Sequence, residues 1–185
     1  NAPGLDTASL QTLGAKLGEP EMQVHARLAN QHKPQLHSHD RFGRRVDEVE
    51  FHPSYHALMA QATAAGLHGT PWTLGAQAHV QRAAGFMLFT ELEPSVLCPI
   101  SMTYAVTPAL RANAAIHAAW LPKLASTAYD PSLVPFEQKA GVTMGMGMTE
   151  KQGGSDVRTN TTQATFEEQT HWGARYGLVG HKWFM

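Results

Sequence analysis

The chain has 185 residues, 43% of them hydrophobic, so it is long enough for one domain with a core, or for one domain and part of another. Fourteen basic and fifteen acidic residues give a formal charge of −1, which argues against a nucleic-acid or anionic-membrane surface. A single cysteine excludes an internal disulfide, and we recognise neither a secretory leader nor an apolar run of membrane-spanning length. We therefore expect a cytoplasmic location.

Helical spacing of apolar residues begins near the amino terminus. Asp6 suits the cap of a first helix that stops at Gly18, and a second helix is predicted to follow Pro20. Residues 32–49 are charged, contain proline and histidine, and show no periodicity. We expect this stretch to be a long loop.

Further helices are predicted downstream. One begins at Pro53 and stops at Gly66, and another spans residues 77–92. The second of these carries an apolar stripe that we expect to face the core: Val80, Ala83, Ala84, Met87 and Leu88. After a connection punctuated by prolines, Thr107 is expected to cap a last helix that ends near Leu121.

The composition changes near residues 135–141, where threonine, glycine and valine replace alanine and leucine. The strands expected after this change are Val142–Met148, Thr162–Glu167 and Tyr176–Met185, the last two joined around His171-Trp172-Gly173. We therefore predict an α+β fold, with an all-α helical domain (residues 1–138) followed by the first strands of a β-barrel or β-sandwich domain (residues 139–185).

The run from Met144 to Asp156 alternates glycines with methionines and ends in Gly-Gly-Ser-Asp. Glycines let the backbone approach a flat ligand closely, and Thr149 and Ser155 add short hydroxyl donors. Glu150 stands where a dinucleotide fingerprint needs its third glycine, and the sequence has no phosphate-binding P-loop. The pattern by itself fits an ordinary glycine-rich turn equally well.

Met148-Thr149-Glu150, then Gly153-Gly154-Ser155-Asp156, with Gly180-His181-Lys182-Trp183-Phe184 one hairpin downstream, resembles the flavin-binding segment of the acyl-CoA dehydrogenase superfamily. Upstream runs at residues 43–47, 51–53, 82–88 and 97–103 extend the resemblance over nearly the whole chain. They are most similar to the branch of the superfamily that responds to DNA alkylation damage.

The resemblance implies bound FAD and an oxidation in which a glutamate removes the α-proton of an acyl thioester while the β-hydride passes to flavin N5. The residues that it places at the cofactor are Met146, Gly147, Met148, Thr149, Gly154, Ser155, Trp183, Phe184 and Met185. Thr149 and Ser155 would also face the thioester. The family's catalytic glutamate lies in a later helical domain, so we expect no catalytic residue in this chain and interpret it as an amino-terminal fragment.

The partners implied by the resemblance are acyl-CoA or a related thioester and further copies of the protein, a tetramer in the family. An alternative function is that of a DNA-binding flavoprotein of the alkylation response with little or no metabolic dehydrogenase activity. Any DNA contact would then come from residues after Met185. A helical interaction module without a ligand is a third alternative.

The remaining candidate ligands are histidines and the cysteine. His37 and His39 lie in a polar stretch, and Pro53 separates His52 from the helix that carries His56, so we predict no metal site. Cys98 is expected to be a small buried side chain.

Overall fold

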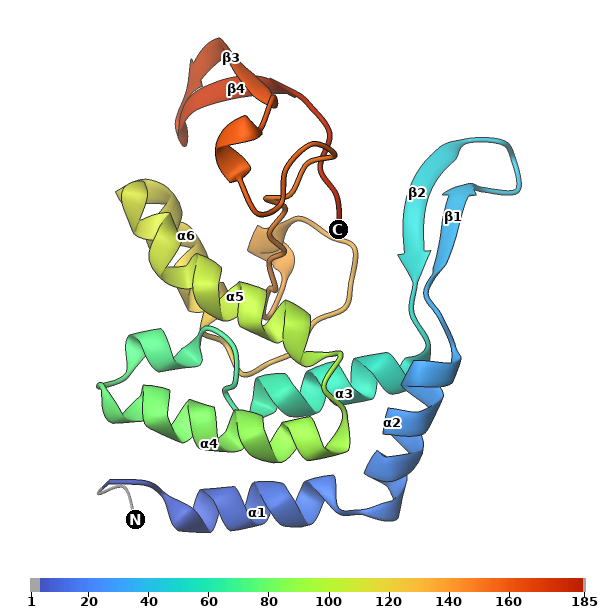
Figure 1. The fold of residues 1–185 in the computed structure, drawn as a ribbon, viewed down its shortest axis with the longest axis vertical. Coiled ribbons are helices and arrows are strands. Elements are labelled where there is room, and N and C mark those ends of the chain that lie inside the picture. The colour runs from blue at the N-terminus through green and yellow to red at the C-terminus, as the bar shows by residue number, and fades with distance from the viewer. Residues whose placement is uncertain (1–3, 185) are drawn as a thin grey trace.

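The amino-terminal helices lie at one end of this elongated molecule and the carboxy-terminal hairpin lies at the other (Figure 1). The computed structural model describes residues 4–184. Its α-helices are α1 (Thr7–Leu17), α2 (Pro20–Gln31), α3 (Pro53–Ala64), α4 (Gln77–Leu92), α5 (Leu97–Ala109) and α6 (Ala114–Leu124). Its strands are β1 (Gln35–His39), β2 (Arg45–Glu50), β3 (Gln163–Thr170) and β4 (Gly173–Val179). The α+β fold class is confirmed, and the β1–β2 hairpin interrupts the helical region between α2 and α3.

Local signals set the ends of the first helices, as predicted. The Asp6 carboxylate accepts a hydrogen bond from the Ser9 backbone N–H (3.0 Å) at the start of α1. Pro20 and Pro53 occupy the first positions of α2 and α3, where no intrahelical N–H bond is lost. Gly66 follows α3 with a φ of +67°, a conformation that favours glycine.

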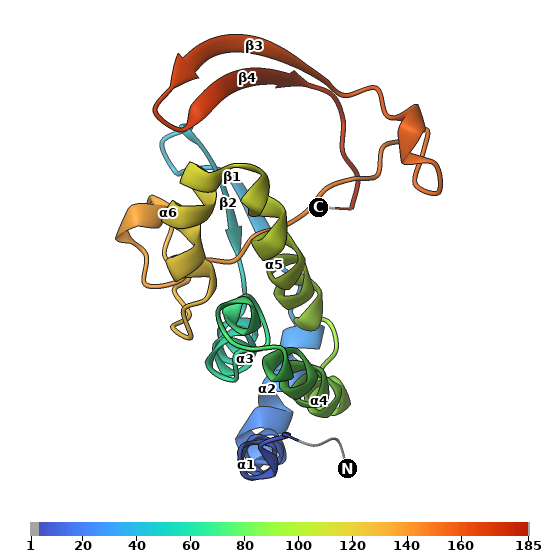
Figure 2. The same ribbon diagram turned by 90° about the vertical axis from the view of Figure 1, so that its left-hand side faces the viewer.

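The hydrophobic core lies among the first five helices. α2 packs against α3 and α1 against α4, while both views place α5 on the opposite side of this layer from α1 (Figures 1 and 2). The buried residues of this core are Leu17, Met22, Leu58, Met59, Ala62, Leu67, Phe89, Val96, Leu97 and Ile100. The helical region therefore encloses its own apolar side chains.

The predicted core face of α4 is wrong. Met87 is 71% exposed and Val80 43% exposed, whereas Gly85 and Phe89 face the core. A Cβ on Gly85 would lie 2.9 Å from Leu67 Cδ2, so the helix comes close to its neighbours at this glycine. Because α4 carries apolar residues on more than one face, this tertiary contact decides its orientation.

The proline-punctuated connection is instead the helix α5, so that prediction is also wrong. Pro99 is the third residue of α5, where the N–H has no intrahelical partner to lose. Pro108 lies in the last turn and removes the N–H donor to the Tyr104 carbonyl, which instead accepts from Trp72 Nε1 (2.8 Å). Thr107 does not cap a helix, because it lies inside α5 and its hydroxyl donates to the Thr103 carbonyl (2.8 Å). Asn113 caps α6. Cys98, expected to be buried, is exposed on α5.

Residues 32–49, expected to be a loop, contain most of the antiparallel hairpin of β1 and β2. Asp40 closes its turn by accepting from the N–H groups of Phe42 (2.8 Å) and Arg44 (2.9 Å). Both strands are exposed along their whole length, and the hairpin projects from the helices (Figure 1). A strand with no buried face shows little apolar alternation, which explains the missed prediction.

The carboxy-terminal part follows the prediction in outline. β3 and β4 form an antiparallel hairpin that turns at His171-Trp172, and Gly173 has a φ of +110°. β4 ends at Val179, earlier than expected, and Met185 lies outside the described residues. The strand expected at residues 142–148 is wrong, because within residues 4–184 no strand pairs with this stretch. Its Met144 N–H instead donates to the Thr103 hydroxyl (3.0 Å) of α5. The domain boundary between residues 138 and 139 stays a prediction.

No helix within residues 4–184 combines the length and the hydrophobicity that crossing a membrane requires.

Candidate functional site

The two sequence runs singled out for ligand binding lie against each other. We call residues 144–156 the glycine-rich segment and residues 180–184 the carboxy-terminal segment. The Trp183 backbone N–H donates to the Thr149 carbonyl (2.9 Å), and Lys182 Nζ lies 3.4 Å from the Met148 carbonyl oxygen. Figure 2 shows the chain returning from β4 to this place. The fold thus brings together runs that are separated by a whole hairpin in the sequence.

A buried carboxylate holds these segments in place. The Glu150 side chain accepts from Lys182 Nζ (2.8 Å), from the Thr161 N–H (2.6 Å) and from the Thr162 hydroxyl (2.5 Å). Gln152 Nε2 donates to it as well (2.7 Å), and Glu150 is only 3% exposed. We call these five residues the Glu150 cluster. Because each donor stabilises the charged form, Lys182 first among them, the pKa of Glu150 is held far below its usual range.

The glycines after Glu150 serve two purposes. Glu150 and Gly153 exchange both backbone hydrogen bonds (3.0 and 3.1 Å), and a Cβ on Gly153 would lie 2.5 Å from the Asp156 carbonyl oxygen. Gly153 is therefore required by the turn itself. A Cβ on Gly154 would lie 3.3 Å from Thr149 Cγ2, but Gly154 and Ser155 are otherwise exposed. Gly154 keeps open the surface next to Thr149.

Hydrogen-bond donors on this surface have no protein partner within residues 4–184. They are the Thr149 hydroxyl, the backbone N–H groups of Gly147, Met148 and Thr149, and the hydroxyl of Ser155. Trp183 beside them is 42% exposed and Phe184 is 81% exposed. Phe184 has a φ of +60°. Unpaired donors next to an exposed aromatic ring and a glycine fit a flat ligand that carries acceptor atoms on its edge.

The predicted binding residues thus occupy two adjacent strips of backbone, apart from Met185, which lies outside the described residues. Met146 and Met148 are each about half exposed on the same stretch. The contribution of Glu150 and Lys182 was missed, although the sequence held a signal: each of the two runs carries one residue of an opposite charge pair. Thr161 and Thr162 gave no comparable signal.

Within residues 4–184 the buried carboxylates are Glu93 and Glu150, and neither is free to act as a base. Both oxygens of Glu150 are occupied by donors. Glu93 is buried at the start of α5, where it accepts from the N–H groups of Ser95 (3.0 Å) and Val96 (2.9 Å). Burial alone would raise the pKa of Glu93, but these hydrogen bonds and one from Asn30 lower it overall. A carboxylate with a lowered pKa is a poor proton acceptor.

The histidines take part in local contacts. His37 Nε2 lies 2.8 Å from a Glu50 carboxylate oxygen on the β1–β2 hairpin, and His52 Nδ1 accepts from the Ser54 N–H (3.1 Å) at the start of α3. In the part of the chain that the structure describes, no three His, Cys, Asp or Glu side chains are grouped to hold a metal ion.

Comparison with known proteins gives consistent matches. Residues 1–131 match the family described as the adaptive response protein AidB N-terminal domain. The chain is 46% identical to the putative acyl-CoA dehydrogenase AidB of Escherichia coli (strain K12), over 98% of this chain and 33% of that protein. It is 29% identical to acyl-CoA dehydrogenase family member 11 of Caenorhabditis elegans, over 96% of this chain and 28% of that protein.

Two solved structures are similar in fold. The apo form of Bd2924 has a TM-score of 0.77 at 29% identity, over 97% of this chain and 36% of that one. Caenorhabditis elegans ACDH-11 in complex with C11-CoA has a TM-score of 0.77 at 25% identity, over 95% of this chain and 29% of that one. The chain therefore spans about a third of the length of the relatives that it matches.

Proposed function

The chain belongs to the family of AidB N-terminal domains and is acyl-CoA dehydrogenase-like. We propose that it forms one wall of an FAD site in an oxidoreductase that acts on an acyl thioester. The observation that carries the proposal is the hydrogen bond between Trp183 and Thr149, which places an exposed aromatic ring beside unpaired donors.

The donor set supports a flavin as the ligand. The pyrimidine edge of a flavin carries carbonyl oxygens and ring nitrogens, which accept from hydroxyl and N–H donors. The Thr149 hydroxyl and the N–H groups of Met148 and Thr149 are available for this within residues 4–184. Gly154 and Ser155 would adjoin the ring and the thioester, and Trp183 and Phe184 would cover its other edge, with Met185 following them.

When bound, FAD would supply the oxidising capacity that removes a hydride from the β-carbon of the thioester. The residues of this chain would orient the ring, and donors near its carbonyls would stabilise the negative charge that arrives with the hydride. The α-proton needs a base, and Glu93 and Glu150 are both committed to other hydrogen bonds. We therefore assign the base to a part of the protein outside this chain.

Cofactor content of the full-length protein tests the proposal. Gly154→Val adds bulk against Thr149, so the purified variant is expected to lose FAD, and Ser155→Pro is expected to do the same by fixing φ and removing an N–H. Gly145→Ala is the matched control, because nothing lies within 4 Å of a Cβ at that glycine. Normal FAD content in both variants would refute the site.

A solved relative supports the proposed substrate. ACDH-11 was solved in complex with C11-CoA, which supports an acyl-CoA or a related thioester as substrate. We also propose that the protein assembles as a homo-oligomer, a tetramer, and acts in the cytoplasm.

The adaptive-response name of the matched family supports a second function. In it the protein is a DNA-binding flavoprotein of the alkylation-damage response with little or no metabolic dehydrogenase activity, and DNA contacts come from residues after Met185. Acyl-CoA oxidation by the full-length protein, measured with an electron acceptor, separates the two. Turnover supports the enzyme, whereas stoichiometric FAD without turnover and with salt-dependent DNA binding supports the alternative.

A further inference from the structure

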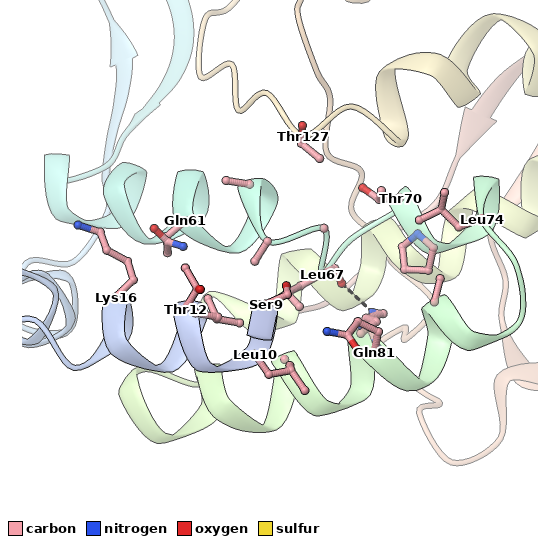
Figure 3. Close-up of a pocket in the computed structure, with 18 of the residues that line it drawn as sticks. Ser9, Leu10, Thr12, Lys16, Gln61, Leu67, Thr70, Leu74, Gln81 and Thr127 are labelled. Carbon is pink, nitrogen blue, oxygen red and sulfur yellow. Dashed lines mark hydrogen bonds between the residues drawn. The ribbon is translucent and has the colours of Figure 1, made fainter. Parts of the chain in front are cut away.

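A cavity of about 800 Å³ lies between α1, α3 and α4, at the end of the molecule opposite β3 and β4 (Figure 1). α1 packs against α4 and leaves a gap towards α3. Figure 3 shows Thr12 and Lys16 of α1 and Gln61 of α3 lying between the two helices. The volume is within the range of about 300–1,000 Å³ that is typical of small-molecule sites.

The deepest part of this cavity is apolar. Three of its lining residues are buried, and all three lack polar side-chain atoms: Leu67, Pro71 and Gly85. Leu67 and Leu13 come together over Gly85, where a Cβ would lie 2.9 and 3.4 Å from their methyl groups. The hydroxyl-bearing side chains of Ser9, Thr12 and Thr127 lie nearer the solvent. Such an interior favours an aliphatic ligand.

One cation of the lining has no counter-charge. Arg82 of α4 is half-buried, and its Nε donates to the Leu67 carbonyl (2.7 Å; dashed line in Figure 3). Its guanidinium carbon lies 3.9 Å from the centre of the Tyr104 ring. Within residues 4–184 no carboxylate lies within 4.0 Å of Arg82, and its terminal nitrogens donate to no protein group. Lys16, the other cation of the lining, is already paired with Glu19 (2.5 Å).

An unpaired guanidinium in a partly buried place favours an anion, and a carboxylate matches its two parallel donors. The burial lowers the pKa of Arg82, which agrees with the lack of a neighbouring negative charge. An aliphatic interior combined with a single free cation matches a ligand that has one hydrocarbon chain and one carboxylate.

We propose that this cavity binds an aliphatic carboxylate, with its chain against Leu13 and Leu67 and its carboxylate on Arg82. The site is separate from the proposed flavin wall and does not depend on it.

Calorimetric titration of the purified protein tests this inference. The probes are decanoate, below its micellar concentration, and decanol, which has the same chain without the charge. Decanoate is expected to bind more tightly than decanol. Arg82→Gln should weaken decanoate binding about tenfold to a hundredfold, the range for a lost charge-assisted hydrogen bond, and should leave decanol unchanged. Arg27→Gln, which removes the same charge from an exposed position on α2, is the control and should change neither.

Ala64→Leu provides a second variant, in case Arg82→Gln fails to fold. Ala64 is an exposed lining residue at the end of α3, so the larger side chain narrows the cavity without disturbing the core, and both probes should bind more weakly. Three results would each overturn the proposal: no binding of decanoate, equal affinity for decanoate and decanol, or decanoate binding that is unaffected by the folded variants.

Discussion

The helical region and the carboxy-terminal region are stabilised in different ways. In the first, large apolar side chains such as Phe89 and Ile100 are fully buried. In the second, the apolar face of the β3–β4 hairpin is open, with Phe166 56% and Leu178 73% exposed, whereas the charged Glu150 is buried. The helices are therefore held by hydrophobic burial, and the proposed flavin wall by charge-assisted hydrogen bonds. An open two-stranded sheet is marginal by itself, so we expect the β3–β4 face to be covered in the assembled protein.

The largest effect on the free energy of unfolding is expected for a substitution in the hydrophobic core. Phe89→Ala should lower the free energy of unfolding by about 3–5 kcal/mol, because it leaves a cavity among α3, α4 and α5. In the 185-residue chain, where the hairpin face is open, Leu178→Ala should change the free energy of unfolding by no more than about 0.5 kcal/mol. Urea denaturation followed by circular dichroism measures both. Similar effects of the two substitutions would show that the hairpin is packed as well as the core.

The next largest effect is expected for a substitution in the Glu150 cluster. Glu150→Gln keeps the shape of the side chain but removes the charge that Lys182 and the two threonines stabilise. Amide hydrogen exchange should then become faster in residues 148–162 and 180–184 and stay the same in α3 and α4. An equal increase across the helices would mean that the cluster supports the whole fold.

Acid should affect the two regions at different pH values. The buried His68 donates to the Ser126 carbonyl (2.8 Å), and burial lowers its pKa, so the unfolded chain takes up a proton first. The helical region should thus begin to lose stability as the pH falls below about 6.5, the ordinary histidine value. Glu150 has a lowered folded-state pKa, so its contribution is complete above the unfolded value of about 4.3 and is lost as the pH falls below it.

Site-specific amide hydrogen exchange between pH 7 and 3.5 would show that the two regions lose stability at different pH values. His68→Gln should remove part of the loss of stability that the helical region shows below about pH 6.5. Loosening of both regions at one pH would contradict it.

The smallest effect concerns a cap. Asp6→Ala removes the hydrogen bond to the Ser9 N–H and should cost about 1 kcal/mol, with fraying confined to α1. Asp47→Ala, on the exposed β2 strand, is the control and should leave α1 unchanged. A cost near zero in thermal denaturation would show that α1 is held by its packing on α4 alone.

Local chemistry explains which predictions from the sequence were right. Asp6, Pro20, Pro53 and Gly66 fix helix ends through contacts with near neighbours in the chain, so the sequence suffices for them. The orientation of α4 depends on how closely Leu67 approaches Gly85, and no periodicity contains that distance.

In the candidate site too, the sequence predicts local features and the tertiary contacts appear only in the folded chain. Its glycines and hydroxyls could be recognised from their types, and only the family resemblance placed Thr149 and Trp183 at one site. The hydrogen bond between their backbones was not predicted. The strand expected at residues 142–148 did not form, because strand formation needs a neighbouring strand, and within residues 4–184 this stretch instead lies along α5. The Glu150 cluster depends on a turn and on two threonines that precede β3, which only the folded chain brings together.

The most direct test of the proposed flavin wall is amide hydrogen exchange of the full-length protein with and without FAD. The predicted result is slower exchange in residues 147–155 and 181–184 on binding, with no change in α1 to α4. Stoichiometric FAD binding that leaves residues 147–155 unprotected would contradict the assignment.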